Sequence, residues 1–331
     1  MPGERTTMRT ECLDSGTHGE NERYAHAMAS AEPVRLAVVG AGRMGRTHLG
    51  ALARAKGVAA VAVVEPVAAV REELAGAGLR VWPSVDELLE QGAIDGAVVA
   101  APTDLHLELV TRLAAAGLPI LCEKPCGMRP EETREAVRAA ADGGVVLQVG
   151  YWRRFVPALV ALRERLAAGA FGVPLLVSCW QWDAQPPAAS FRERSGGILL
   201  DMGVHELDQI RWLTGRELEE IVAFATGTDP DTATAFVHVE DGPDAVISLG
   251  RTFPHGDCCW VELMGTSGYV RELFMWGEDG QHVFEHALVA QAEAFAAAVR
   301  GEPPRGASGA DAIRAIECAE RAAGSLAATP V

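Results

Sequence analysis

The stretch VRLAVVGAGRMG, residues Val34–Gly45, decides the fold. Val34–Val39 is a short apolar run with β-branched residues that ends at a glycine, which predicts a buried parallel strand. Gly40 allows a tight turn, Gly42 lets the backbone approach a pyrophosphate, and Gly45 lets the following helix pack closely on the strand. The helix N-terminus then faces the phosphate charge. The stretch therefore predicts a dinucleotide-binding turn.

An acidic residue follows at the expected distance. Glu65 ends the second predicted strand, twenty residues past Gly45. A carboxylate at this place suits the ribose hydroxyls of NAD and would repel the 2′-phosphate of NADP. Arg43 and Arg71 keep NADP open as the less favoured alternative, because an arginine there accommodates a phosphate. The pattern favours NAD.

Strands and helices alternate up to Gly150, which predicts an α/β Rossmann domain, a doubly wound parallel sheet, over residues 33–150. A capping box at Ser84 and Glu87 predicts one more helix start. The predicted strands are Val34–Val39, Val58–Val64, Ala97–Ala101, Ile120–Cys122 and Val145–Val149, and the predicted helices are 43–55, 105–116 and 130–141.

After Gly150 strands follow one another with short turns and few helices between them. This texture predicts an α+β domain with an antiparallel or mixed sheet over residues 151–331. The predicted strands are Leu175–Trp182, Ile221–Ala225, Ala233–Val239, Ala245–Arg251, Cys259–Met264 and Tyr269–Leu273, followed by helices at 287–299 and 309–323. Residues 1–32 are polar without an apolar period, which predicts a disordered N-terminal extension.

Bulk composition narrows the classes of function. The 331 residues carry a net charge of −16, which argues against nucleic acid as a partner. No apolar run is long enough to predict a membrane span, and no secretory signal is visible. The seven cysteines lack a paired zinc-ligand spacing, so we expect reduced thiols in the cytoplasm and no metal site.

Lysine is scarce, and this makes one lysine stand out. Lys56 and Lys124 are the two lysines among 29 basic residues. Lysine can lose a proton where arginine cannot. Lys124 lies in Glu123-Lys124-Pro125, directly after a predicted buried strand, and ligands bind at the carboxyl ends of such strands. We therefore interpret Lys124 as a reactive residue.

A second cluster lies in residues 196–208. Asp201, His205 and Asp208 are spaced i, i+4, i+7, which places them on one face of a helix. A histidine beside a carboxylate is the usual unit of proton transfer near neutral pH. The spacing predicts an acid–base site.

These residues together carry a resemblance to a known family. The chain resembles the glucose–fructose oxidoreductase/inositol dehydrogenase family (Gfo/Idh/MocA) over nearly all of residues 34–325. The matching features are the glycine turn, Ala101-Pro102-Thr103-Asp104-Leu105-His106, Glu123-Lys124-Pro125, Gly150-Tyr151-Trp152-Arg153-Arg154-Phe155 and the Asp201…His205 block, in family order. Thr103 departs from the asparagine that the family often has.

The resemblance implies roles for particular residues. It implies a catalytic set of Lys124, Asp201 and His205, and the segment around Arg153 looks most like inositol dehydrogenases. It also implies a cis bond before Pro125 and a large open sheet whose outer face forms a homodimer or homotetramer. The cofactor-binding set is Gly40, Gly42, Arg43, Met44, Gly45, Glu65, Thr103, His106, Glu123 and Lys124, and the substrate set is Tyr151, Trp152, Arg153, Trp182, Asp183 and Asp208.

The expected chemistry is oxidation of a hydroxyl-bearing carbon of a sugar or cyclitol. A hydride passes to the nicotinamide while His205 takes the hydroxyl proton and Lys124 binds the reacting oxygen. Trp152, Trp180 and Trp182 are the best aromatic candidates for contacting a sugar face. Because the chain is acidic and Asp183 and Asp208 could bind an ammonium group, an amino-cyclitol or aminoglycoside-type substrate is also a hypothesis.

Two other classes stay open. The first is a non-catalytic NAD-binding sensor on the same fold, since a fold does not fix a function. The second is another reaction known in the family, above all NAD-dependent glycoside hydrolysis. NADH formation with polyols separates both from a dehydrogenase.

Overall fold

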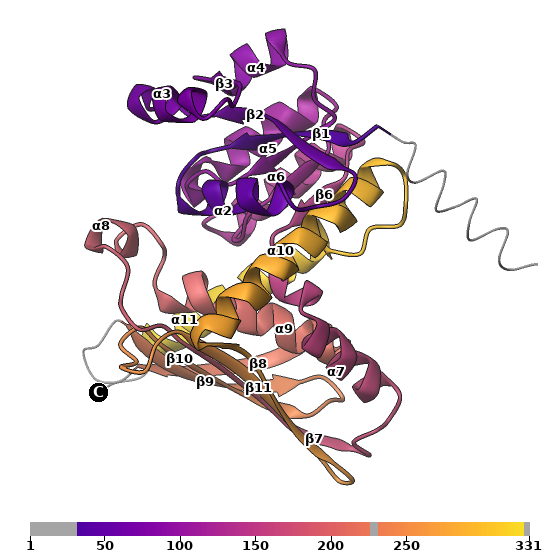
Figure 1. Cartoon of the computed structure of the whole chain (residues 1–331). Coiled ribbons are helices and arrows are strands. Elements are labelled where there is room, and N and C mark those ends of the chain that lie inside the picture. The colour runs from indigo at the N-terminus through magenta and orange to yellow at the C-terminus, as the bar shows by residue number, and fades with distance from the viewer. Residues whose placement is uncertain (1–31, 226–230, 328–331) are drawn as a thin grey trace, which may run out of the picture. The chain divides into compact units, whose positions relative to one another are not determined.

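The computed structural model describes residues 32–225 and 231–327, which form two β-sheets with helices between and around them (Figure 1). The predicted extension falls, apart from residue 32, outside the described residues. The domain boundary at residue 150 stays a prediction. Strand β13 (Ala307–Ser308), which comes after that boundary, pairs with the first sheet.

The first sheet is the predicted doubly wound one. Its strand order is β13-β6-β5-β4-β1-β2-β3, parallel except for β13 on β6. The order reverses between β1 and β4, the place where such sheets bind ligands. The strands are β1 Val34–Val39, β2 Val58–Val64, β3 Val81–Trp82, β4 Gly96–Val99, β5 Ile120–Cys122, β6 Leu147–Val149 and β13 Ala307–Ser308.

Helices cover both faces of this sheet. Ser84 caps α4 by accepting the Glu87 amide, as the capping box predicted. One face packs on Phe295 of α10, a helix from the far end of the chain, against Leu36 and Leu121. The helices are α2 Arg43–Leu52, α3 Ala68–Gly76, α4 Val85–Gln91, α5 His106–Ala115, α6 Pro130–Asp142 and α10 Gly277–Val299, with a 3₁₀ turn η1 at Thr103–Leu105.

The second sheet has strand order β12-β11-β7-β10-β9-β8. Only β7 and β10 pair in parallel, so the sheet is mixed and mostly antiparallel, and the expectation of an antiparallel or mixed sheet is confirmed. The strands are β7 Pro174–Trp182, β8 Leu218–Ala225, β9 Thr232–Val239, β10 Asp244–Gly250, β11 Cys258–Gly265 and β12 Tyr269–Trp276.

Helices cover one face of the second sheet. They are α7 Pro157–Ala167, α9 Val204–Thr214, α10 and α11 Gly309–Ala327, drawn above the strands in Figure 1. No described helix lies on the opposite face, where Phe236 is 56% and Tyr269 57% exposed. The alternation of buried and exposed residues along β9 follows from this one-sided cover. The outer face therefore exposes several large apolar side chains.

Several elements differ from the sequence predictions. Helices α3 and α7 were missed, and α10 begins at Gly277 rather than at 287. The segment before 287 is polar, yet Phe284 packs edge-on against Trp152 at 4.9 Å, so a tertiary contact holds this turn. The predicted strand Ala97–Ala101 ends at Val99, because Ala101 bends toward the glycine turn.

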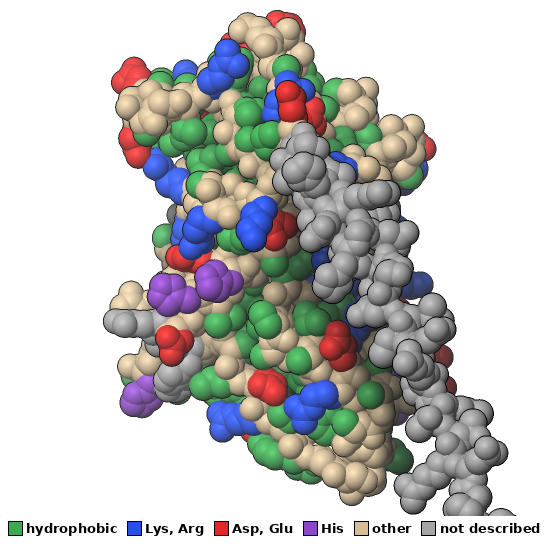
Figure 2. Space-filling view, turned by 45° about the vertical axis from the view of Figure 1, so that its right-hand side comes forward, with side chains coloured by type: hydrophobic (Ala, Val, Ile, Leu, Met, Phe, Trp, Pro, Cys, Tyr) green, Lys and Arg blue, Asp and Glu red, His purple; other side chains and the backbone are tan. Residues whose placement is uncertain are grey.

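The surface carries charges of both signs. On the face in Figure 2, basic and acidic side chains are interspersed and do not gather into one charged patch. Among the described residues, no helix is long and apolar enough to cross a membrane. The six cysteines within the described ranges are free and buried.

Candidate active site

The glycine turn has the geometry that its three glycines predict. Gly40 has φ +94° and lies so close to Ala101 that a Cβ would approach its backbone to 2.8 Å. A Cβ on Gly45 would lie 1.9 Å from the Gly40 carbonyl oxygen. A Cβ on Gly42 would meet nothing within 4 Å. Two glycines are thus required by packing, and Gly42 faces open space.

That open space fits a pyrophosphate. Gly42 is the N-cap of α2 in an extended conformation, and no described side chain caps the helix. No acidic residue lies in its first turn, so the amides of Arg43 and Met44 and the helix dipole keep their attraction for an anion. The absence of a side chain on Gly42 lets a phosphate reach these amides.

Glu65 lies beside the turn, as predicted. Its carboxylate is buried and accepts the Ala41 amide at 2.9 Å through Oε2 and the Val67 amide at 2.9 Å through Oε1. A carboxylate oxygen has two lone pairs, so each can also accept a ribose hydroxyl. Glu65 therefore shapes the turn, and its contact with a ribose stays a prediction.

The arginines that kept NADP open are placed differently from one another. Arg71 donates to the backbone oxygens of Glu65 and Pro66. Arg46, one turn into α2, pairs with Glu73. Arg43 is exposed at the start of the helix. Of the two arginines named from sequence, only Arg43 has no partner described.

The segment after β5 is built around a buried carboxylate. Glu123 accepts from Nε2 of His48 at 2.7 Å and from the Lys124 amide at 3.2 Å. Burial would raise the pKa of Glu123, but His48 and Lys124 together bring it below its usual range. The Lys124–Pro125 bond is cis, as the resemblance implied. Glu123 thus ties α2 to the lysine.

Lys124 reaches the second cluster, 77 positions away in sequence. Its Nζ donates to the Asp201 carbonyl oxygen at 2.7 Å and lies 3.4 Å from Asp201 Oδ1. Asp201 lies in a single π-helical turn, η3 Leu199–Gly203, a feature frequent at functional sites. The two sequence clusters therefore meet in space.

The other oxygen of the Asp201 carboxylate has a partner that the sequence did not reveal. Oδ2 accepts from Nη2 of Arg251, which directly follows β10. Arg251 also contacts Asp231. A single arginine after an apolar strand gives no signal of such a contact, and a lone buried histidine such as His48 gives none either.

His205 lies on the first turn of α9. Tyr151 packs edge-on to its ring at 6.0 Å and Trp152 at 6.4 Å. Burial, and then the charges of Lys124 and Arg153, hold the pKa of His205 well below the ordinary 6.5. The imidazole is therefore neutral at neutral pH and able to accept a proton.

Asp208 and Arg153 have partners within the protein. Arg154 binds both oxygens of Asp208, at 2.6 and 3.0 Å. Arg153 lies 2.6 Å from Glu206 and donates to Gln181. These are buried ion pairs that hold the segment after β6 on α9. That Arg153 and Asp208 also contact the substrate stays a prediction.

Trp182 also lies away from the reactive groups. Along β7, Cys179 and Gln181 face the helices, so Trp180 and Trp182 point to the opposite face. Trp180 stacks on Trp260 at 5.2 Å, and the Trp182 ring covers Gly250. Neither supports a sugar-contacting role, because strand alternation sends both side chains to the outer face.

Asp183 follows Trp182 and lies two positions after Gln181, whose side chain faces the helices. Its amide donates to Gly250 and its carbonyl oxygen accepts the Phe253 amide, both at 2.9 Å. Burial, followed by the charge of Asp257, raises the pKa of Asp183 to about 6, and the charges of Arg251 and Asp201 reach it. Asp183 therefore lies close enough to Arg251 and Asp201 for their charges to act on its carboxyl group.

Two predicted cofactor residues lie in the turn after β4. Thr103 starts η1. His106 is buried, with Nδ1 2.8 Å from the Pro125 oxygen and Nε2 2.9 Å from the Ala101 oxygen. His106 thus links the segment beside Gly40 to the Lys124-Pro125 segment, and its contact with the cofactor stays a prediction.

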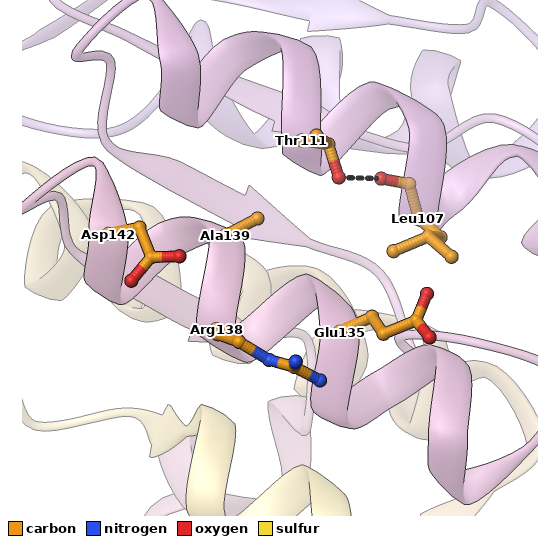
Figure 3. Close-up of a pocket in the computed structure, with 6 residues that line it drawn as sticks. All are labelled: Leu107, Thr111, Glu135, Arg138, Ala139 and Asp142. Carbon is orange, nitrogen blue, oxygen red and sulfur yellow. Dashed lines mark hydrogen bonds between the residues drawn. The ribbon is translucent and has the colours of Figure 1, made fainter.

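Figure 3 shows a surface groove elsewhere, between α5 and α6, lined by Leu107, Thr111, Glu135, Arg138, Ala139 and Asp142. The Thr111 hydroxyl turns back to the Leu107 carbonyl oxygen of its own helix. None of these residues belongs to the site above. Within the described residues, no group of histidine, cysteine or acidic side chains is arranged to hold a metal ion.

Comparison with known proteins identifies the family. Residues 34–151 match the model for the oxidoreductase family with an NAD-binding Rossmann fold, and residues 159–271 match the GFO/IDH/MocA C-terminal domain. The chain belongs to the Gfo/Idh/MocA oxidoreductase family. It is an NAD-dependent oxidoreductase.

Individual members of the family are similar over most of the chain. The rhizopine catabolism protein MocA of Rhizobium meliloti is 48% identical, over 87% of this chain and 93% of that protein. Myo-inositol dehydrogenase Hyg17 of Streptomyces leeuwenhoekii is 35% identical, over 88% and 97%. The structure of GenD2 from gentamicin A biosynthesis, in complex with NAD, matches with TM-score 0.82 and 26% identity, over 90% and 95%.

Proposed function

We propose that this Gfo/Idh/MocA protein oxidises a secondary alcohol of a cyclitol or sugar to a ketone, and catalyses the reverse reduction. The observation that carries the proposal is the contact of Lys124 with Asp201 beside a neutral, buried His205. A cation and a neutral base next to a dinucleotide turn are the groups that alcohol oxidation needs.

In the proposed reaction the protein binds the reacting oxygen of the substrate and accepts its hydroxyl proton. Lys124 donates a hydrogen bond to the reacting oxygen and stabilises the negative charge that develops there. His205 accepts the hydroxyl proton as the C–H bond breaks. Asp201 orients Lys124. Bound NAD supplies the hydride acceptor at its nicotinamide, and the substrate leaves as a ketone.

The substrate class is supported by two kinds of observation. Relatives named as inositol dehydrogenases, including Hyg17, share most of the chain. The second is Asp183, whose carboxyl group feels the charges of Arg251 and Asp201. Above about pH 6 this carboxylate is ionised and attracts a cation. We therefore extend the proposal to amino-cyclitol or aminoglycoside-type substrates, in which an ammonium group faces Asp183.

We also propose that two copies assemble through the outer face of the second sheet. Exposed Phe236, Met264, Tyr269 and Leu273 lie there, which suits a self-complementary contact. Arg271 packs over the Trp260 ring at 4.6 Å on the same face. This contact would form a homodimer, and a homotetramer would need a second contact between two such dimers. The free, buried thiols of the described cysteines support the proposed cytoplasmic location.

The test is NADH formation from a panel of compounds. Purified protein is mixed with NAD and, in turn, neutral inositols, hexoses and amino-substituted cyclitols, with the Lys124→Ala variant as control. Absorbance at the NADH band should rise with at least one cyclitol and not with the variant. If no compound yields NADH although NAD binds, the protein is the sensor; a glycoside hydrolysed without net NADH formation identifies the glycosidase.

A further inference from the structure

Arg251 is a buried cation that directly follows β10, one of the two central strands of the second sheet. It is 2% exposed and is among the largest fully buried side chains of the described residues. Its backbone amide donates to the Asp231 carbonyl oxygen at 3.0 Å, and Nη1 lies 3.3 Å from Asp231 Oδ1. Nη2 contacts Asp201 Oδ2. An arginine so buried needs acidic partners on both sides, because an unpaired buried charge is strongly unfavourable.

The pairing continues beyond Arg251. The second oxygen of Asp231, Oδ2, accepts from Nη1 of Arg192. Arg192 ends α8 (Ala189–Arg192), in the segment between Asp183 and Gly196. The order Lys124, Asp201, Arg251, Asp231, Arg192 therefore alternates positive and negative charge from the active site to that segment.

This arrangement determines what Asp201 can do. Arg251 takes Oδ2, so Lys124 is left with the carbonyl oxygen at 2.7 Å and Oδ1 at 3.4 Å. The longer second distance leaves Lys124 free to share its protons with a third oxygen. Without Arg251 the carboxylate would turn fully toward the lysine, since opposite charges attract strongly where burial keeps water out.

We propose that Arg251 is a positioning residue for the reaction. It fixes the Asp201 carboxylate so that Lys124 is held by the main-chain oxygen and keeps one N–H directed to the substrate oxygen. The planar guanidinium suits this task because it can bind two carboxylates at once in fixed directions, which an ammonium group does less well. The inference rests on the proposed function of Lys124.

The test compares charge removal at Arg251 with charge removal at a matched arginine. Arg211 is also buried and ion-paired, with Glu217, on α9. We expect Arg251→Met to lower kcat by about 10- to 100-fold, as a displacement of about 1 Å at a reacting group does. Rates are divided by the concentration of NAD-binding sites, which is measured by titration, so that misfolded protein does not lower the apparent kcat. The Kd of NAD should stay unchanged, and Arg211→Met should keep kcat.

Two further variants separate positioning from folding. Arg251→Lys restores the charge and should recover part of kcat. If Arg251 only filled space, Arg251→Lys would not have a higher kcat than Arg251→Met. If Arg251→Met does not fold, Asp231→Asn takes its place, because it weakens the hold on Arg251; Glu217→Gln is its control. Asp231→Asn should lower kcat per site severalfold.

Wild-type kcat per site in Arg251→Met, or in Asp231→Asn where the former does not fold, overturns the proposal. So does an equal loss in the control variants. If instead Lys124→Ala keeps its activity, the proposed function itself fails, so the two failures are distinguishable.

Discussion

The cofactor end and the reactive end of this protein are built in different ways. At the cofactor end, Gly40, Gly42, Gly45 and Glu65 act within one strand–turn–helix–strand unit, largely through backbone atoms. At the reactive end, Lys124 meets Asp201 across 77 positions, and Arg251 meets Asp201 across 50. The first site is local and written into the sequence, whereas the second exists only after both sheets have formed.

Removing a reactive group should have the largest effect, and it should lower turnover without changing NAD binding. Lys124→Ala or His205→Ala is expected to lower kcat by roughly 100-fold or more, because each removes a group that acts on the proton or oxygen in the transition state. The Kd of NAD, measured by fluorescence titration, should change little. Steady-state NADH formation measures kcat.

The result depends on both numbers. Near wild-type turnover in either variant means that the reactive end lies elsewhere. A parallel loss of NAD affinity would mean instead that the two ends are not separable, and Lys124 would then serve mainly the cofactor.

The same contrast explains what the sequence could predict. Val34–Val39 and Ile120–Cys122 were predicted with their observed bounds, because buried parallel strands are continuous apolar runs between turns. Lys124, Asp201 and His205 were selected as candidates from residue type, spacing and resemblance. Strand β13 was missed, because two residues paired by a tertiary contact carry no periodic pattern.

Contacts between distant segments account for the rest. Sequence gives no sign that Arg251 would reach Asp201, that His48 would bind Glu123, or that Arg154 would occupy Asp208. The outer-face position of Trp182 could not be predicted either, because strand parity fixes a face only once the covered face is known. Each of these depends on which elements pack together, and local pattern does not contain that.

Two glycine substitutions test the cofactor end, because one should affect NAD binding and the other stability. Gly42→Ala should fold normally, because its Cβ meets nothing within 4 Å, yet weaken NAD binding by roughly 30-fold by crowding the pyrophosphate. Gly45→Ala should destabilise the protein, because its Cβ would lie 1.9 Å from a carbonyl oxygen. Thermal unfolding and NAD titration separate the two effects. Equal affinity for NAD in wild type and Gly42→Ala would contradict the assigned phosphate position.

A smaller effect is expected at Glu65. Glu65→Gln keeps the shape of the side chain and removes the charge that repels a 2′-phosphate. The ratio of kcat/KM for NAD to that for NADP should fall by about tenfold. The variant also loses an acceptor for Ala41 or Val67, which costs about 1 kcal/mol of stability. An unchanged ratio would mean that Glu65 only shapes the turn.

The smallest effect should come from Asp183, through pH. Its pKa of about 6 lies above the ordinary 3.8, so the ionised form that attracts an ammonium group is lost as pH falls through about 6. The KM of an amino-cyclitol should therefore rise a few-fold between pH 7 and about pH 5, while the KM of a neutral inositol stays nearly level. Asp183→Asn should remove this difference, with neutral inositol as the internal control. A preference for the amino substrate that is the same at both pH values would place the ammonium group away from Asp183.

The raised pKa of Asp183 also affects stability, because the folded state binds the proton more tightly than the unfolded state does. Asp183 therefore contributes stability that is lost as pH rises through about 6. Asp183→Asn should flatten that part of the profile of unfolding free energy against pH.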